Sequence, residues 1–246
     1  MRKLILLLAL ILLLPACTTI PANTSLFKIK YKELMNNASS EAVMVDIEQF
    51  NELDELASTD SEHMQAKLAL AFAYYKDVQF AVSVEHLEAF INNYPSYPHL
   101  DYVLYLRALA TKAQGKLELT QAINNISANT SYPEKLRLAH TYFIDLITRY
   151  PKSQYSSQAL NFMKNIRTNL AAYEMFVARY DLVEGNYEEV IRRCRYVIEF
   201  YENTPVVNQA YKLQARTYRL MKQPEQAEKI EKIQKQKLAE QALGSH

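Results

Sequence analysis

The chain has 246 residues, and its 28 lysines and arginines nearly balance its 27 aspartates and glutamates, for a formal net charge of +1. This balance lacks the basic surplus that nucleic-acid binding requires, and only three glycines are present, which excludes glycine-rich phosphate loops and dinucleotide fingerprints. Three glycines are also too few for the turns of a sizeable β or α/β fold, so the composition predicts an all-α protein.

The chain begins with a short targeting signal. Arg2 and Lys3 precede an unbroken apolar run over residues 4–14. This run is shorter than the roughly 20 residues that a membrane-spanning helix needs. Basic residues followed by a short apolar run are typical of a secretion signal.

The sequence LPAC at residues 14–17 resembles the lipobox of bacterial lipoproteins. The resemblance implies cleavage before Cys17, a signal peptide over 1–16 and a lipidated linker over 17–25. Stable anchoring needs more than one acyl chain, and a triacylated Cys17 would supply three. Thr18 is not the aspartate that retains enteric lipoproteins at the inner membrane, so we expect the periplasmic face of the outer membrane. An ordinary secretory signal with a chance cysteine is the alternative.

Apolar residues recur at helical spacing along the rest of the chain, with prolines between the stripes. A helix, a short turn, a second helix and an aromatic-proline pair recur, which predicts an all-α, tetratricopeptide-like solenoid of helical hairpins. About five repeats are predicted, over residues 26–60, 62–95, 98–151, 155–201 and 206–240. We group them as N-terminal repeats over 26–151 and C-terminal repeats with a capping helix over 152–246. Residues 114–132 are predicted to form a loop or an insertion in the third repeat.

Several helix ends are also predicted. Pro133 and Pro205 suit the first position of a helix. Gly185 suits the left-handed end of a helix, and Asn186 can cap the next helix together with Glu189.

Three segments go beyond periodicity: YPSYPHLDYVLYLRALA at 94–110, RYPKSQYSSQAL at 149–160 and LAAYEMFVARY at 170–180. They resemble the BamD family, the tetratricopeptide lipoproteins of the machine that assembles β-barrel proteins in the Gram-negative outer membrane. The first repeat, in contrast, lacks the glycine-aromatic and Tyr-Pro signals that are usual in that family.

The resemblance implies a scaffold without catalytic activity or cofactor. Its implied partners are the periplasmic domains of the barrel protein BamA, the accessory lipoproteins of the machine and unfolded β-barrel clients. The N-terminal repeats of this family meet the C-terminal β-signal of the client. The alternative is another periplasmic tetratricopeptide lipoprotein, for example an adaptor for cell-wall enzymes.

The candidate partner-binding residues are Arg193, Asp101, Tyr102 and Arg107. Arg193 aligns with a family arginine that contacts BamA, although the cluster of arginines at 192–195 could instead pair with glutamates four residues away. Asp101, Tyr102 and Arg107 could line a groove. Tyr102 could equally pack between repeats, and Arg107 could pair with a nearby acid.

No other chemistry is expected. The five histidines are not spaced as metal ligands, and no Gly-x-Ser-x-Gly nucleophile elbow is present. Cys194 shares an apolar stripe and is expected to be a buried small hydrophobe. We therefore expect neither a metal site nor an enzyme.

Overall fold

The computed structural model describes residues 25–40, 44–124 and 133–243, and these ranges contain helices and no strand. The predicted signal peptide, Cys17 and most of the linker lie outside the described residues. The helices are α1 (Leu26–Ser39), α2 (Ile47–Glu52), the 3-10 helix η1 (Leu53–Leu56), α3 (Asp60–Lys76), α4 (Phe80–Asn93), α5 (Leu100–Asn124), α6 (Glu134–Arg149), α7 (Ser156–Val183), α8 (Tyr187–Phe200), α9 (Val207–Leu220) and α10 (Pro224–Leu243). Within these ranges no helix combines the length and hydropathy needed to cross a bilayer.

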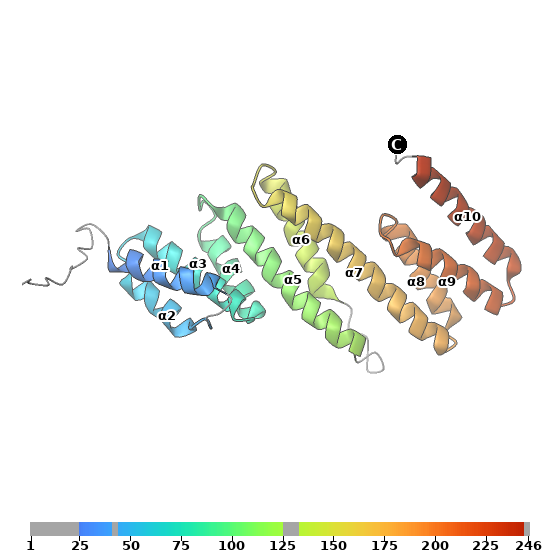
Figure 1. Ribbon diagram of the computed structural model, residues 1–246, viewed down its shortest axis with the longest axis horizontal. Coiled ribbons are helices and arrows are strands. Elements are labelled where there is room, and N and C mark those ends of the chain that lie inside the picture. The colour runs from blue at the N-terminus through green and yellow to red at the C-terminus, as the bar shows by residue number, and fades with distance from the viewer. Residues whose placement is uncertain (1–24, 41–43, 125–132, 244–246) are drawn as a thin grey trace, which may run out of the picture.

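The helices follow one another along an elongated molecule, from α1 at one end to α10 at the other (Figure 1). They form five hairpins, in which α1, α3, α5, α7 and α9 are the first helices and α2–η1, α4, α6, α8 and α10 the second helices. Each first helix also packs against the first helix of the next hairpin, from α1 with α3 to α7 with α9. The predicted all-α, tetratricopeptide-like solenoid is thereby confirmed, whereas the grouping into two sets of repeats stays a prediction.

The packing is uneven across the solenoid. Consecutive first helices touch, but consecutive second helices do not pack closely within the described residues. The second helices are therefore splayed, and this asymmetry leaves room for surface hollows between them.

The largest core cluster runs without interruption from α5 to α9. Leu136, Phe143, Ile166 and Met175 are at most 1% exposed within it. Full burial of each such side chain contributes about 1.5–3 kcal/mol. Cys194 is also fully buried in this cluster, as its place in the apolar stripe predicts.

Three hairpins share one turn geometry. Val78, Gly185 and Lys222 occupy the same place between the two helices and have φ values of 64°, 78° and 60°. After each of them, an amide donates to the carbonyl five residues earlier: Gln79 to Tyr74 at 2.9 Å, Asn186 to Asp181 at 2.8 Å and Gln223 to Tyr218 at 2.9 Å. This is the longer bond of the Schellman motif. The prediction for Gly185 is confirmed, and two other hairpins make the same turn without glycine.

The loop predicted over 114–132 is wrong for its first part, because α5 continues to Asn124; residues 125–132 lie outside the described residues. Gly115 is buried inside α5 and faces the start of α6. A Cβ atom there would lie 2.6 Å from the backbone nitrogen of Leu136. The glycine therefore permits close helix packing rather than breaking the helix.

The predicted helix starts are corrected in detail. Pro205 lies in the turn before α9, which begins at Val207, and Pro133 directly precedes α6. Asn186 precedes α8, but its side chain makes no capping hydrogen bond. The Glu189 carboxylate accepts from the Arg192 guanidinium instead, at 2.7 Å.

Candidate functional site

Five tyrosines from the first-helix side of successive hairpins gather in one region: Tyr31 on α1, Tyr75 on α3, Tyr102 and Tyr105 on α5, and Tyr155 just before α7. We call them the tyrosine cluster. The ring of Tyr155 stacks on that of Tyr105 at a centroid distance of 4.6 Å and lies 5.7 Å from that of Tyr102. Tyr105 is buried, whereas the other four are half-buried.

The tyrosine hydroxyls of the cluster also raise one another's pKa values. Burial raises the pKa of Tyr102, and the nearby hydroxyls of Tyr155, Tyr31 and Tyr75 raise it further. Burial likewise raises the pKa of Tyr105. The cluster therefore keeps its phenolic protons and offers apolar ring surface beside neutral hydroxyls, a combination suited to polypeptide contacts.

Asp101 fixes the turn that carries Tyr155. The Ser153 hydroxyl donates to the Asp101 carboxylate at 2.6 Å, and the same hydroxyl oxygen accepts from the Tyr155 amide at 3.2 Å. Asp101 and Tyr102 are thus brought together at the start of α5. Their contact with a partner stays a prediction, while the packing of Tyr102 between hairpins is confirmed.

Arg107 lies farther along α5 and faces α6. Its Nη2 atom is 3.2 Å from a carboxylate oxygen of Asp145, and its guanidinium lies 3.7 Å from the centre of the Tyr142 ring. The Tyr142 hydroxyl donates in turn to Glu88 on α4. The alternative expectation, that Arg107 pairs with a nearby acid, is confirmed, and this network ties α4, α5 and α6 together.

Arg193 is also held inside the fold. Its Nη1 donates to Glu174 and its Nε to Asp181, both at 2.9 Å. Both acids belong to α7, so the expected pairing of Arg193 with Glu189 four residues away is not what the structure shows. Arg193 lies on α8, whereas the tyrosine cluster lies on α1, α3, α5 and just before α7. The contact of Arg193 with BamA stays a prediction.

Three of the hollows that the described residues form lie between successive second helices. The first, of about 330 Å³, is enclosed by α2–η1, α3 and α4. The second, of about 270 Å³, lies among α6, α7 and α8. The third, of about 240 Å³, is formed by α9, α10 and the turn after α8. We name them by their helices as the α2–α3–α4, α6–α7–α8 and α8–α9–α10 hollows.

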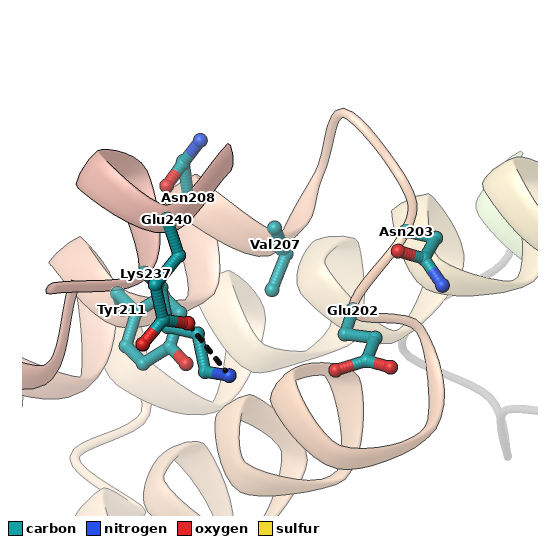
Figure 2. Close-up of a pocket in the computed structure, with 7 residues that line it drawn as sticks. All are labelled: Glu202, Asn203, Val207, Asn208, Tyr211, Lys237 and Glu240. Atoms are coloured by element: carbon teal, nitrogen blue, oxygen red, sulfur yellow. Dashed lines mark ion pairs between the residues drawn. The ribbon is translucent and has the colours of Figure 1, made fainter. Parts of the chain in front are cut away.

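The α8–α9–α10 hollow has mixed charge. Figure 2 shows Lys237 and Glu240 paired on α10, with Glu202 and Asn203 on the opposite side. The Lys237 ammonium is 3.3 Å from the Glu240 carboxylate. In the α2–α3–α4 hollow, Lys67 pairs with Asp54 at 3.1 Å. The lysine of each of these two hollows is thus matched by a carboxylate.

The described residues contain no group of three or more histidine, cysteine, aspartate or glutamate side chains that could hold a metal ion. The Cys194 thiol is buried, and burial raises its pKa to about 12, which keeps it protonated and unreactive at neutral pH.

Sequence reasoning missed most of the tyrosine cluster and all three hollows. The 18 tyrosines and the absence of tryptophan were visible, but no local pattern shows which tyrosines meet across hairpins. The hollows draw residues from three helices each, so no spacing along one helix could have revealed them.

Comparisons with known proteins extend this picture. A family model described as "YfiO: Outer membrane lipoprotein" matches residues 22–233. An outer membrane protein assembly factor BamD of Neisseria gonorrhoeae is 28% identical over 236 residues, covering 92% of this chain and 88% of the relative. The protein of the same name from Vibrio cholerae is 27% identical over 188 residues, covering 76% and 78%.

Proposed function

Because this chain belongs to the YfiO family of outer membrane lipoproteins, we propose that it is a subunit of the machine that assembles β-barrel proteins in the outer membrane. The observation that carries the proposal is the family match over 22–233, which begins before α1 and ends within α10. The relatives that bear the name assembly factor BamD match across most of the same range.

In this role the chain is a scaffold without catalytic activity. The solenoid would bind the periplasmic domains of BamA and the accessory lipoproteins, with Arg193 on α8 at the BamA contact. Stacked hairpins expose long continuous surfaces, which suits the simultaneous binding of several polypeptides.

The lipid anchor would hold one end of the solenoid at the periplasmic face of the outer membrane. Ser25, which caps α1, stands eight residues after Cys17. A fully extended chain advances at most about 3.6 Å per residue, so a lipidated Cys17 would lie within about 29 Å of α1. The first hairpin would therefore stay close to the membrane surface.

Unfolded clients would contact the tyrosine cluster. The cluster spans four successive first helices, from α1 to the start of α7, which is a suitable length for an extended strand. Tyrosine rings provide large contact area at low entropic cost, and their hydroxyls can bond to the client backbone.

The test is affinity purification of the full-length tagged chain from outer membranes, with Cys17→Ser as a matched variant. Two results support the proposal: BamA co-purifies with the wild-type chain, and the Cys17→Ser chain is lost from the membrane fraction. Recovery of murein hydrolases without BamA would instead support an adaptor for cell-wall enzymes.

A further inference from the structure

The α6–α7–α8 hollow differs in charge from the other two hollows. Its polar wall is formed by Arg137 on α6 and Arg167 on α7, together with His140. None of its eight lining residues carries a carboxylate. The hollow is thus a positively charged recess on a chain whose overall charge is close to zero.

Arg167 is held by a neutral group. Its Nη2 atom donates to the backbone carbonyl of Phe200, the last residue of α8, at 2.6 Å, and it makes no ion pair within the described residues. Arg107 and Arg193, in contrast, are each bonded to carboxylates. Arg137 adds a second guanidinium, which donates to the Tyr196 hydroxyl.

An aromatic surface stands beside these cations. Phe200 is 51% exposed, and the centre of its ring lies 4.8 Å from that of Tyr196. Leu170 is buried and also lines the hollow. A ligand that enters can therefore cover apolar surface and meet a guanidinium at the same time.

His140 provides a further polar atom without a partner. Its Nε2 atom is buried and makes no hydrogen bond within the described residues. Burial and the charge of Arg167 lower the pKa of His140, so the ring is neutral at neutral pH. An unmet buried polar atom costs stability unless something bonds to it, and a polar ligand in the hollow could do so.

We propose that the α6–α7–α8 hollow binds one or two residues of a partner's extended peptide in which a carboxylate stands next to an aromatic or aliphatic side chain. The carboxylate would pair with Arg167 and Arg137, because a guanidinium binds carboxylates through two parallel hydrogen bonds. The adjoining side chain would cover Phe200 and Tyr196. A hollow of about 270 Å³ is too small for a helix and suits one or two extended residues.

This site goes beyond the proposed function and is separate from the tyrosine cluster, which lies on the first helices of the hairpins. The α8–α9–α10 hollow cannot serve in the same way, because Glu202 and Glu240 would repel a carboxylate (Figure 2). That hollow supplies the matched control.

The test measures binding of a fluorescent peptide, Gly-Ser-Phe-Asp-Phe-Gly blocked at both ends, to the full-length chain in detergent. A second peptide carries asparagine in place of aspartate. The protein variants are Arg167→Gln and Phe200→Ser, with Lys237→Gln in the other hollow as the control. Phe200→Ser changes an exposed ring, so it stays interpretable even if Arg167→Gln unfolds, and thermal unfolding is recorded for every variant.

We expect the asparagine peptide, Arg167→Gln and Phe200→Ser each to weaken binding by about tenfold, and Lys237→Gln to leave it unchanged. Equal binding of the two peptides, equal binding by the folded Phe200→Ser variant, or no saturation up to about 1 mM peptide would overturn the proposal. So would Arg167-dependent binding of phosphatidylglycerol vesicles without peptide binding, which would assign the hollow to lipid headgroups. Because the assay uses purified chain and a synthetic peptide, its failure would leave the role in barrel assembly untouched.

Discussion

Arg193 on α8 and Glu174 on α7 form a buried ion pair, with Nη1 and Oε2 2.9 Å apart. The Glu174 side chain is 4% exposed and that of Arg193 17%. Removal of one member leaves the other charge in a poorly solvated place, which costs more than the pair contributes. Any change at Arg193 therefore acts on the fold as well as on a partner.

Arg193→Ala is expected to lower the free energy of unfolding by about 3 kcal/mol, because Glu174 would remain buried without its cation. Arg192→Ala is the control, since Arg192 is exposed and its pair with Glu189 is worth less than about 1 kcal/mol. Urea unfolding followed by circular dichroism measures both. Equal losses in the two variants would show that the buried pair is not special.

Variants of the same ion pair can separate a direct contact of Arg193 with BamA from an effect on the fold. Glu174→Gln removes one acid but keeps the positive charge of Arg193, whereas Arg193→Glu reverses it. If Arg193 contacts BamA directly, Arg193→Glu abolishes co-purification while folded Glu174→Gln retains it. Loss in both variants would point to the packing of α7 against α8 rather than to a direct contact.

Gly115→Ala is expected to destabilise the protein by about 2 kcal/mol, although alanine favours helix, because the added methyl would strike the backbone at Leu136. Thr120→Ala on the exposed part of the same helix is the control and is expected to change stability little. Thermal unfolding distinguishes the two. A stabilised Gly115→Ala protein would mean that α5 and α6 are not in close contact there.

Val78 is the β-branched residue in the shared hairpin turn; its φ is 64° and the residue is 61% exposed. Left-handed backbone costs a non-glycine residue about 1–2 kcal/mol. Val78→Gly is therefore expected to raise the free energy of unfolding by about 1 kcal/mol, after allowance for the flexibility of glycine. Gly185→Val should lower the free energy of unfolding. A loss of stability in Val78→Gly would contradict a left-handed backbone at Val78 in the shared turn.

Tyr142 predicts a response to alkaline pH. Burial and its hydrogen bond to Glu88 raise the pKa of Tyr142 from 10.0 to about 12. Between these two values the folded protein keeps a proton that the unfolded chain loses. The contribution of Tyr142 to the free energy of unfolding is therefore complete below pH 10 and declines as the pH rises toward 12. Tyr142→Phe should reduce the loss of stability over that interval, and an unchanged slope would contradict the assigned environment.

The hairpins could be predicted because the helices carry apolar stripes and several of the breaks between them contain a proline. Gly115 was misleading, since a glycine in a polar stretch is usual in loops and only the approach of α6 shows its role. Pro205 was misleading for a related reason: its backbone suits a helix start and a turn equally well. Features within one helix were visible in the sequence, and features set by a neighbouring helix were not.

The candidate residues illustrate the same limit. The sequence indicated Asp101, Tyr102, Arg107 and Arg193 one at a time. Only the fold shows that Asp101 and Tyr102 lie beside the turn that carries Tyr155. It also shows that Arg107 and Arg193 are bonded in two separate networks between helices. The partners of a charged side chain depend on packing, which local spacing does not determine.

The tyrosine cluster predicts where clients bind. A photo-crosslinker in place of Tyr155 is expected to capture unfolded β-barrel proteins during their assembly, because this ring lies among the other tyrosines of the cluster. A crosslinker in place of Tyr187, half-buried at the start of α8, is the control and should capture far less. Equal capture at both positions would contradict client binding at the tyrosine cluster.

The most direct test of the central claim is the amount of folded β-barrel protein in the outer membrane of the source bacterium after this chain is depleted. The account predicts that folded barrels decline, that BamA loses its co-purifying scaffold, and that the wild-type chain restores both while Cys17→Ser does not. Unchanged levels of folded barrels in depleted cells would contradict a role in outer membrane protein assembly.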